Sequence, residues 1–334
     1  MTRRDRNVTS FRSADRCAQM NRKPGNSSTT EARNPASEGI DSLSASEIVR
    51  LMNAEDANVA TAVGLETENI ARAVEEIATR VRQGGRLIYI GAGTSGRLGV
   101  LDASECPPTF NTPPELVVGI IAGGPKALTR SIEGAEDYPQ QSVADLKAVA
   151  VSGNDTVVGI ATSGRTPYVI SGLEFSRSRG AFTVGLCCND ESQLATVSDL
   201  MITPVVGPEV VSGSTRLKAG TATKMVLNML TTGTMVLLGK TFGNLMVDLR
   251  ATNAKLTERT RRIVMQLTSL TQNGADELLA QCDGELKTAV VAHLRSVSPD
   301  QARRLLDDSG GHLRRVLDES AQLGDSKNRP DGAS

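Results

Sequence analysis

The chain has 334 residues, which is enough for one large or two modest domains with a substantial buried core. Its formal net charge is -1, which argues against a general attraction to nucleic acids or anionic membranes. Aromatic residues make up only 2% of the sequence and tryptophan is absent, so a platform of stacked aromatic rings is not expected. A small ligand would therefore be recognised through polar groups.

Cysteine and histidine content limits the chemistry that is available. The five cysteines are odd in number and lack C-x-x-C spacing, which argues against a disulfide framework or a zinc site. We therefore expect a reduced, cytoplasmic protein with no metal and no organic cofactor. No stretch approaches the roughly 20 continuous apolar residues of a membrane span. The two histidines, His293 and His312, lie away from the glycine-rich turns described below, so carboxylates, hydroxyls, lysines and arginines are the candidates for chemistry.

The N-terminal region divides into a polar extension and two helices. Residues 1–33 contain eight Arg or Lys and three Asp or Glu with little apolar material, which predicts a disordered basic extension. Ser44 and Glu47 form a capping box that predicts the start of a first helix. Apolar residues at helical spacing predict a second helix over residues 59–81.

A strand and a glycine-rich turn follow. The apolar run over residues 87–90 is typical of a strand buried on both faces in a parallel sheet. The next residues read Gly91-Ala-Gly-Thr-Ser-Gly96. Glycines such as Gly93 let the backbone approach a ligand, and Thr94 and Ser95 add hydroxyls beside the free N–H groups of a helix start. This turn is therefore predicted to bind an anion.

The glycine spacing also fits the dinucleotide motif G-x-G-x-x-G. A dinucleotide fold places an acidic residue about 20 positions later, at the end of the second strand, to hold a ribose. The next apolar run, residues 116–121, ends in Ala122-Gly-Gly and carries no acid. The sequence therefore favours a phosphate over a nucleotide.

A second turn repeats this pattern after the apolar run at residues 157–160. It carries hydroxyls and a glycine, and Pro167 behind it suits the first turn of a helix. Two such turns on neighbouring strands can converge on one phosphate. The candidate ligands from this turn are Ser163, Gly164, Arg165 and Thr166.

The remaining chain predicts the fold class and its divisions. Further strands at residues 182–186 and 200–204, separated by helices, indicate an α/β fold with a doubly wound parallel sheet flanked by helices. Short helices after residue 273 predict a small all-helical module, similar to a ubiquitin-associated (UBA-like) fold. We expect a sheet domain with N-terminal helices at 34–272, the helical module at 273–320 and a disordered tail at 321–334.

Several longer motifs occur in one order along the chain. They are Gly-Ala-Gly-Thr-Ser-Gly-Arg (91–97), Asp-Ala-Ser-Glu-Cys-Pro-Pro-Thr (102–109), Glu-Gly-Ala-Glu-Asp (133–137), Ser-Gly-Arg-Thr-Pro-Tyr-Val (163–169) and Gly-Asn-Leu-Met-Val-Asp (243–248). With these motifs, the sequence resembles the sugar isomerase (SIS) family and, within it, the N-acetylmuramic acid 6-phosphate etherase family, from about residue 31 to about residue 317.

The resemblance implies cleavage of the D-lactyl ether of N-acetylmuramic acid 6-phosphate by elimination and hydration. It implies that Glu105 is the proton donor, beside a helix end set by two prolines, and that Glu136 is the second catalytic acid. We assign Glu136 as the base at C2, with the order of the two roles open. Lys218 lies before a long helix, where it and nearby hydroxyls are candidate anion ligands. Relatives work as dimers, so a homodimer that binds a sugar phosphate, and neither nucleic acid nor membrane, is expected.

Two rival functions share these features. A sugar-phosphate sensor, such as the glucokinase regulatory protein, binds its ligand without converting it. An aldose–ketose isomerase shares the proton abstraction at C2. An isolated acid near a helix end is usually a solvated surface residue, but the presence of both Glu105 and Glu136 beside intact turns favours an enzyme over a sensor.

Overall fold

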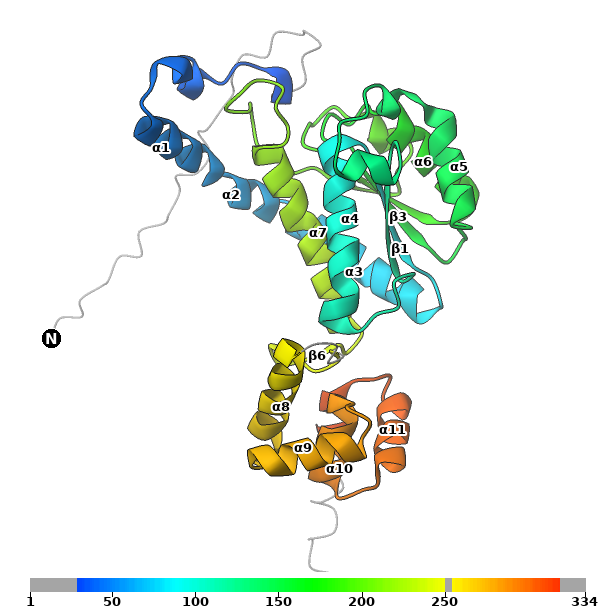
Figure 1. The fold of residues 1–334 in the computed structure, drawn as a ribbon. Coiled ribbons are helices and arrows are strands. Elements are labelled where there is room, and N and C mark those ends of the chain that lie inside the picture. Colours follow the sequence, from blue (N-terminus) through cyan, green and yellow to red (C-terminus); the bar gives the residue numbers. More distant parts are fainter. Residues whose placement is uncertain (1–28, 250–253, 319–334) are drawn as a thin grey trace, which may run out of the picture.

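The computed structural model describes residues 29–249 and 254–318 (Figure 1). The predicted basic extension up to residue 28 and the predicted tail over 321–334 lie outside these described residues. Among the described helices, none combines the length and the apolar character needed to cross a lipid bilayer.

Five parallel strands form the central sheet, in the order β2-β1-β3-β4-β5. Strand β1 lies between β2 and β3, and Leu87 is paired to Val117 of β2 and to Thr156 of β3. Parallel neighbours require crossover connections, and helices supply them here. The predicted doubly wound sheet is therefore confirmed. The strands are β1 (Leu87–Gly91), β2 (Val117–Ile121), β3 (Thr156–Ile160), β4 (Phe182–Leu186) and β5 (Leu200–Ile202).

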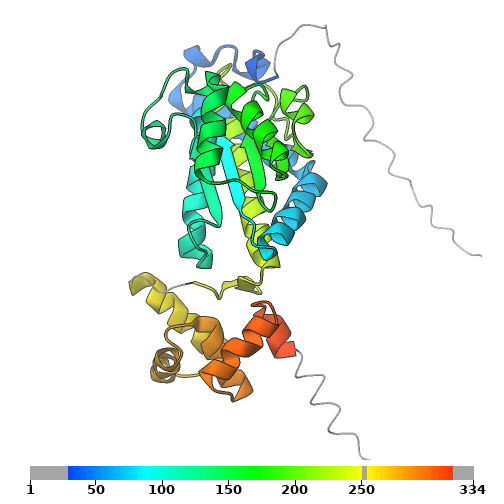
Figure 2. The same ribbon diagram turned by 90° about the vertical axis from the view of Figure 1, so that its right-hand side faces the viewer.

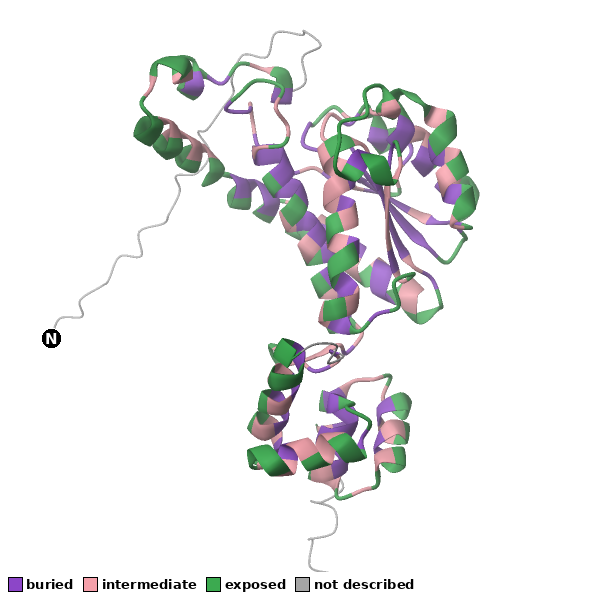
Figure 3. Ribbon diagram, in the orientation of Figure 1, coloured by how far each residue is buried: buried purple, intermediate pink, exposed green. Residues whose placement is uncertain are grey.

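Alternating side chains of these strands build two hydrophobic cores, one on each face of the sheet. Leu87 and Tyr89 face a core shared with α3, α4 and α7. Ile88 and Ile90 face a second core shared with α5 and α6. Helices thus cover both faces. Strands β1 and β3 are fully buried, whereas the middle of the edge strand β2 is half-buried (Figures 2 and 3). The helices are α3 (Thr67–Arg82), α4 (Gly93–Phe110), α5 (Pro139–Ala148), α6 (Pro167–Ser178) and α7 (Lys218–Leu237).

An N-terminal arm precedes the sheet and contains α1 (Ala45–Asp56) and α2 (Val59–Gly64). The predicted capping box is present, since the Ser44 N–H donates to Glu47 Oε2 at 2.8 Å. Residue 30, which we assigned to the basic extension, is a fully buried threonine whose N–H faces the side chain of Asn189 at 3.4 Å. The part of the arm that packs on the domain therefore includes residues 29–33.

The helix predicted over residues 59–81 is two helices, because α2 ends at Gly64 and α3 begins at Thr67. Glycine weakens a helix interior, and the Thr67 hydroxyl donates to the Gly64 carbonyl at 2.6 Å. A side chain thus takes an acceptor that a continuous helix would give to a backbone N–H.

The C-terminal region is helical and has its own hydrophobic core, which extends from Val247 to Val316. A short hairpin of β6 (Thr241–Phe242) and β7 (Leu245–Met246), absent from the sequence-based expectation, connects it to α7. Since Leu256 and Ile263 of α8 also lie in this core, we propose that the module begins near residue 247. Its helices are α8 (Ala254–Thr268), α9 (Gln272–Gln281), α10 (Leu286–Arg295) and α11 (Pro299–Asp308).

Candidate active site

The reversal of strand order around β1 and β3 creates a crevice at the carboxyl edge of the sheet. Helix α4, which follows β1, packs on one face, whereas α6, which follows β3, packs on the other. In open α/β sheets, ligands bind at such a switch point. The first turn (residues 91–96) and the second turn (residues 161–167) therefore lie beside each other at the usual position of a ligand.

The first turn is held in shape by contact between its glycines. A Cβ atom on Gly91 would lie 2.8 Å from the Gly96 nitrogen, and one on Gly96 would lie 2.6 Å from the Gly91 oxygen. Gly93 adopts a φ of +53° with open space around it, and α4 begins there without a side-chain cap. Half-buried Thr94 and Ser95 follow in the first turn of the helix. An uncapped helix start with two hydroxyls is suited to an anion.

The second turn depends on Gly164, which has a φ of +71°. A Cβ atom at this position would lie 2.2 Å from Ser192 Oγ, so both conformation and space demand glycine. The Ser163 hydroxyl accepts the Arg165 N–H at 3.3 Å and remains half-exposed, as does Thr166. The two hydroxyls border the start of α6, while the Arg165 side chain is exposed.

Glu136 is exposed in a short 3-10 turn, Ala135–Asp137, that packs beside α6. The preceding Gly134 has a φ of +70°, which reverses the chain there. The loop before it is tied to α4, because Arg97 in the second turn of that helix donates to the carbonyl of Leu128 at 3.2 Å and to that of Arg130 at 3.0 Å. The loop that carries Glu136 is thus anchored at the edge that contains both turns.

Glu105 lies on α4 and its side chain is exposed. It follows Ser95 by ten residues, which corresponds to about 15 Å along a helix axis. The predicted helix end at the two prolines is wrong, because α4 continues through Pro107 and Pro108 to Phe110. The prolines fall in the last turn, and the helix ends directly after it, at Asn111, with a left-handed φ of 51°.

A groove between α4 and α7 surrounds Glu105. Asp102 lies in it, and its carboxylate accepts the Tyr89 hydroxyl at 3.0 Å and the Thr231 hydroxyl at 3.2 Å. Burial raises the pKa of Asp102. Burial also raises the pKa of Cys106 to about 12, so this thiol is protonated at neutral pH and is a poor nucleophile.

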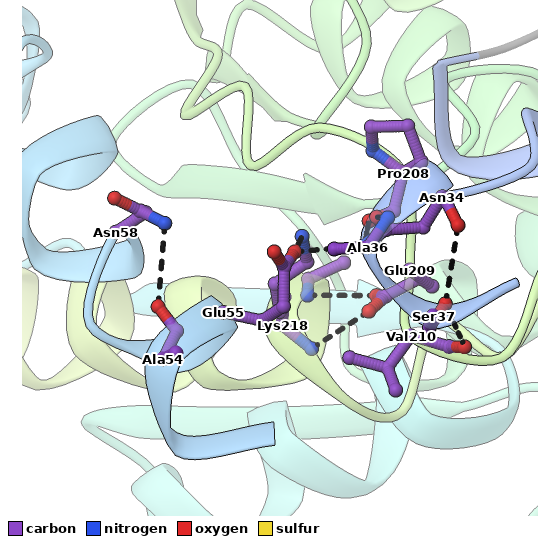
Figure 4. Close-up of polar contacts among 11 residues, drawn as sticks. Asn34, Ala36, Ser37, Ala54, Glu55, Asn58, Pro208, Glu209, Val210 and Lys218 are labelled. Carbon is purple, nitrogen blue, oxygen red and sulfur yellow. Dashed lines mark hydrogen bonds and ion pairs between the residues drawn. The ribbon is translucent and has the colours of Figure 1, made fainter. Parts of the chain in front are cut away.

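Lys218 is buried at the start of α7, where an ion pair engages its charge (Figure 4). Its Nζ lies 2.6 Å from Glu55 Oε2 of α1, and the same oxygen accepts the Asn34 side-chain amide at 2.7 Å. The hydrogen bond from Lys218 lowers the pKa of Glu55. The two oxygens of Glu209 accept the backbone N–H groups of Lys218 and Ala219, each at 3.0 Å. A carboxylate of the chain itself therefore caps this helix start.

The structure thus separates the candidate residues into three places. The two turns and Glu136 share the carboxyl edge, Glu105 lies in the α4–α7 groove, and Lys218 faces the arm. The sequence analysis did not assign a role to three polar residues of this groove, Asp102, Lys224 and Asn228. Helical spacing is the sequence signal for them. Asp102 is three residues from Glu105 on α4, and Asn228 is four residues from Lys224 on α7, so each pair lies on one side of its helix.

Comparison with known proteins gives the family. The N-acetylmuramic acid 6-phosphate etherase of Rhodopirellula baltica is 64% identical over 292 residues, which cover 87% of this chain and 97% of that protein. The etherase of the same name from Streptomyces coelicolor is 56% identical over 296 residues, covering 89% and 94%. This chain belongs to the N-acetylmuramic acid 6-phosphate etherase family.

Family models agree with the sheet of this etherase-family chain. The N-terminal SIS domain of the glucokinase regulatory protein matches residues 69–177, and the SIS domain matches residues 140–233. Among solved structures, the phosphoheptose isomerase of Neisseria gonorrhoeae is 18% identical and has a TM-score of 0.45, covering 57% of this chain and 98% of that one.

Proposed function

We propose that this protein cleaves the D-lactyl ether of N-acetylmuramic acid 6-phosphate and so acts as a carbon–oxygen lyase in the breakdown of cell-wall amino sugars. The products are N-acetylglucosamine 6-phosphate and D-lactate. The observation that carries the proposal is 64% identity to a named etherase over 97% of that protein. Both glutamates and both turns that the family resemblance requires are present and ordered.

In this proposal the sugar phosphate is anchored at the carboxyl edge. The hydroxyls of Ser95, Ser163 and Thr166, together with the N–H groups at the uncapped start of α4, hold the phosphate. Gly93, Thr94, Gly164 and Arg165 complete the two turns around it. Binding energy from this remote group positions the reacting carbons, which lowers the barrier of the chemical step.

The two glutamates divide the proton transfers. Once the ring opens to the aldehyde, the C2 proton becomes acidic, and the Glu136 carboxylate removes it. The C3–oxygen bond breaks as a C2–C3 double bond forms, and the Glu105 carboxyl protonates the departing lactyl oxygen. Water then adds to C3 and a proton returns to C2, which gives the product sugar. Elimination followed by hydration adds up to hydrolysis of the ether. The sugar and the lactate together are neither oxidised nor reduced, so the reaction needs no redox partner.

We further propose a homodimer in which Glu105 serves a substrate held by the turns of the partner. The distance of about 15 Å between Ser95 and Glu105 along α4 is much farther than C3 lies from the phosphate of the same sugar. The two helices that form the groove carry exposed apolar side chains, as expected of an interface. They are Leu101 on α4 and Met229, Val236 and Leu237 on α7.

We also propose a cytoplasmic location, which is supported by four free, buried cysteines among the described residues: Cys106, Cys187, Cys188 and Cys282.

The direct test is release of D-lactate from N-acetylmuramic acid 6-phosphate, followed with a coupled D-lactate dehydrogenase. One lactate should be released for each N-acetylglucosamine 6-phosphate formed. An isomerase would convert an aldose to a ketose without lactate, and a sensor would bind the sugar phosphate and leave it unchanged. Either result would reject the proposed activity.

A further inference from the structure

The groove between α4 and α7 contains a cation for which the mechanism above has no role. Lys224 lines the groove on the α7 side, opposite Glu105 and Asp102 of α4. It is exposed, unlike Lys218 six residues earlier in the same helix, which is buried in its ion pair with Glu55.

A chain of hydrogen bonds connects this lysine to the sheet. The hydroxyl of fully buried Tyr89 donates to one oxygen of Asp102 at 3.0 Å. The other oxygen of Asp102 accepts the Asn228 amide at 3.2 Å, and the Asn228 oxygen accepts Lys224 Nζ at 2.7 Å, in the amide orientation that satisfies both partners. The ammonium is thus held by neutral Asn228 on one side, which leaves its other N–H groups for a ligand in the groove.

The substrate of the proposed reaction has two anionic groups, the phosphate on C6 and the carboxylate of the lactyl ether on C3. The phosphate belongs to the two turns. The ether oxygen must lie within hydrogen-bond reach of Glu105 to receive its proton. The lactyl carboxylate is joined to that oxygen through a single carbon, so it must lie in the same groove as Glu105.

We propose that Lys224 binds the lactyl carboxylate of the substrate and thereby distinguishes N-acetylmuramic acid 6-phosphate from sugar phosphates that lack the lactyl group. Asn228 and Asp102 are positioning residues, since they act through the lysine. This inference rests on the proposed etherase activity. A charge-assisted hydrogen bond of this kind also orients the leaving group beside the acid that protonates it.

The test compares ligands with and without the lactyl group in the full-length protein. Lys224→Met should raise the KM for N-acetylmuramic acid 6-phosphate by about 10- to 100-fold, the range for loss of a hydrogen bond to a charged group. The Kd for N-acetylglucosamine 6-phosphate, measured by calorimetry, should stay within about twofold, since that product has no carboxylate. Lys224→Arg should recover most of the affinity. Asn228→Ala should raise the same KM by a smaller factor.

Lys147→Met is the matched control, because it removes an exposed lysine from α5 on the opposite face of the sheet. A Lys224→Met protein with unchanged KM, or with equal loss of affinity for both sugar phosphates, would overturn the carboxylate role. Thermal unfolding of each variant separates loss of binding from loss of fold. If wild-type protein releases no lactate at all, the proposed activity itself is rejected, and this inference with it.

Discussion

The carboxyl edge of the sheet and the α4–α7 groove are two candidate binding surfaces that are built from different parts of the chain. At the edge, the backbone forms the site, since Gly93 and Gly164 adopt left-handed conformations and two helices begin beside them. In the groove, side chains form the site, and its hydrogen bonds join residues as far apart as Asp102 and Thr231, 129 positions along the chain. In the proposed mechanism, phosphate anchoring belongs to the carboxyl edge and acid chemistry to the groove, so we expect that substitutions can disable each function separately.

The largest effect is expected from Glu105→Gln in the groove. Loss of a general acid should lower kcat by about 10²- to 10⁴-fold, with little change in KM because the phosphate is held elsewhere. Initial rates of lactate release measure both. Glu75→Gln, which changes an exposed glutamate on α3, should match the wild type. Turnover of Glu105→Gln within a few-fold of wild type would remove this residue from the chemistry.

Glu136→Gln tests the proton abstraction at C2, which we assign to the carboxyl edge of the sheet. Without the base, incorporation of solvent deuterium at C2 should stop together with lactate release, with a loss of about 10²-fold or more. Glu105→Gln should still exchange the C2 proton while it releases little lactate. Mass spectrometry or NMR of recovered sugar reports the exchange. The reverse pattern would exchange the roles of the two glutamates.

Substitution of the second turn should affect binding more than turnover. Ser163→Ala combined with Thr166→Val removes two hydroxyls from the phosphate and should raise KM by more than about tenfold, with kcat changed less. Ser178→Ala is the control, because it removes a serine hydroxyl at the opposite end of α6 and should leave KM unchanged. An unchanged KM in the double variant would mean that the phosphate binds elsewhere.

The smallest effect on activity is expected at Lys218, where stability should change instead. Glu55→Gln leaves the buried ammonium without its ionic partner and should destabilise the protein by about 2 kcal/mol, more than Lys218→Met does. The pKa of Glu55 is lowered in the folded state. The carboxylate therefore makes its full contribution to the free energy of unfolding above pH 4.5, its pKa in the unfolded chain, and this contribution is lost as the pH falls through the lower pKa of the folded state. The Tm of the wild type should therefore fall more steeply with acid than that of Glu55→Gln. A raised KM with unchanged Tm for Lys218→Met would instead support a ligand role.

The strands and both turns could be predicted because their signals are local. A buried strand appears in the sequence as a short apolar run. A glycine-rich turn with hydroxyl residues appears within about six consecutive residues. The capping box of Ser44 and Glu47 is local in the same way. The positions of both turns were therefore predicted from the sequence alone, and the ligand roles of their residues stay a prediction.

The remaining features depend on contacts between distant segments, which one sequence does not display. The break between α2 and α3 required knowing that Thr67 would bond to Gly64. The partner of Lys218 is 163 residues away in α1, and the groove around Lys224 exists only because α4 and α7 pack together. Sequence patterns indicated which residue types are present there, but not which of them meet.

In the proposed homodimer, each active site combines the turns and Glu136 of one subunit with Glu105 of the other. This arrangement is tested by mixing differently tagged Glu105→Gln and Glu136→Gln proteins, unfolding and refolding them together, and purifying the doubly tagged dimer. One of the two sites in that dimer would then carry both native glutamates, so the purified doubly tagged dimer should recover about half of wild-type activity. A doubly tagged dimer as inactive as its parents would contradict an active site shared between the two subunits.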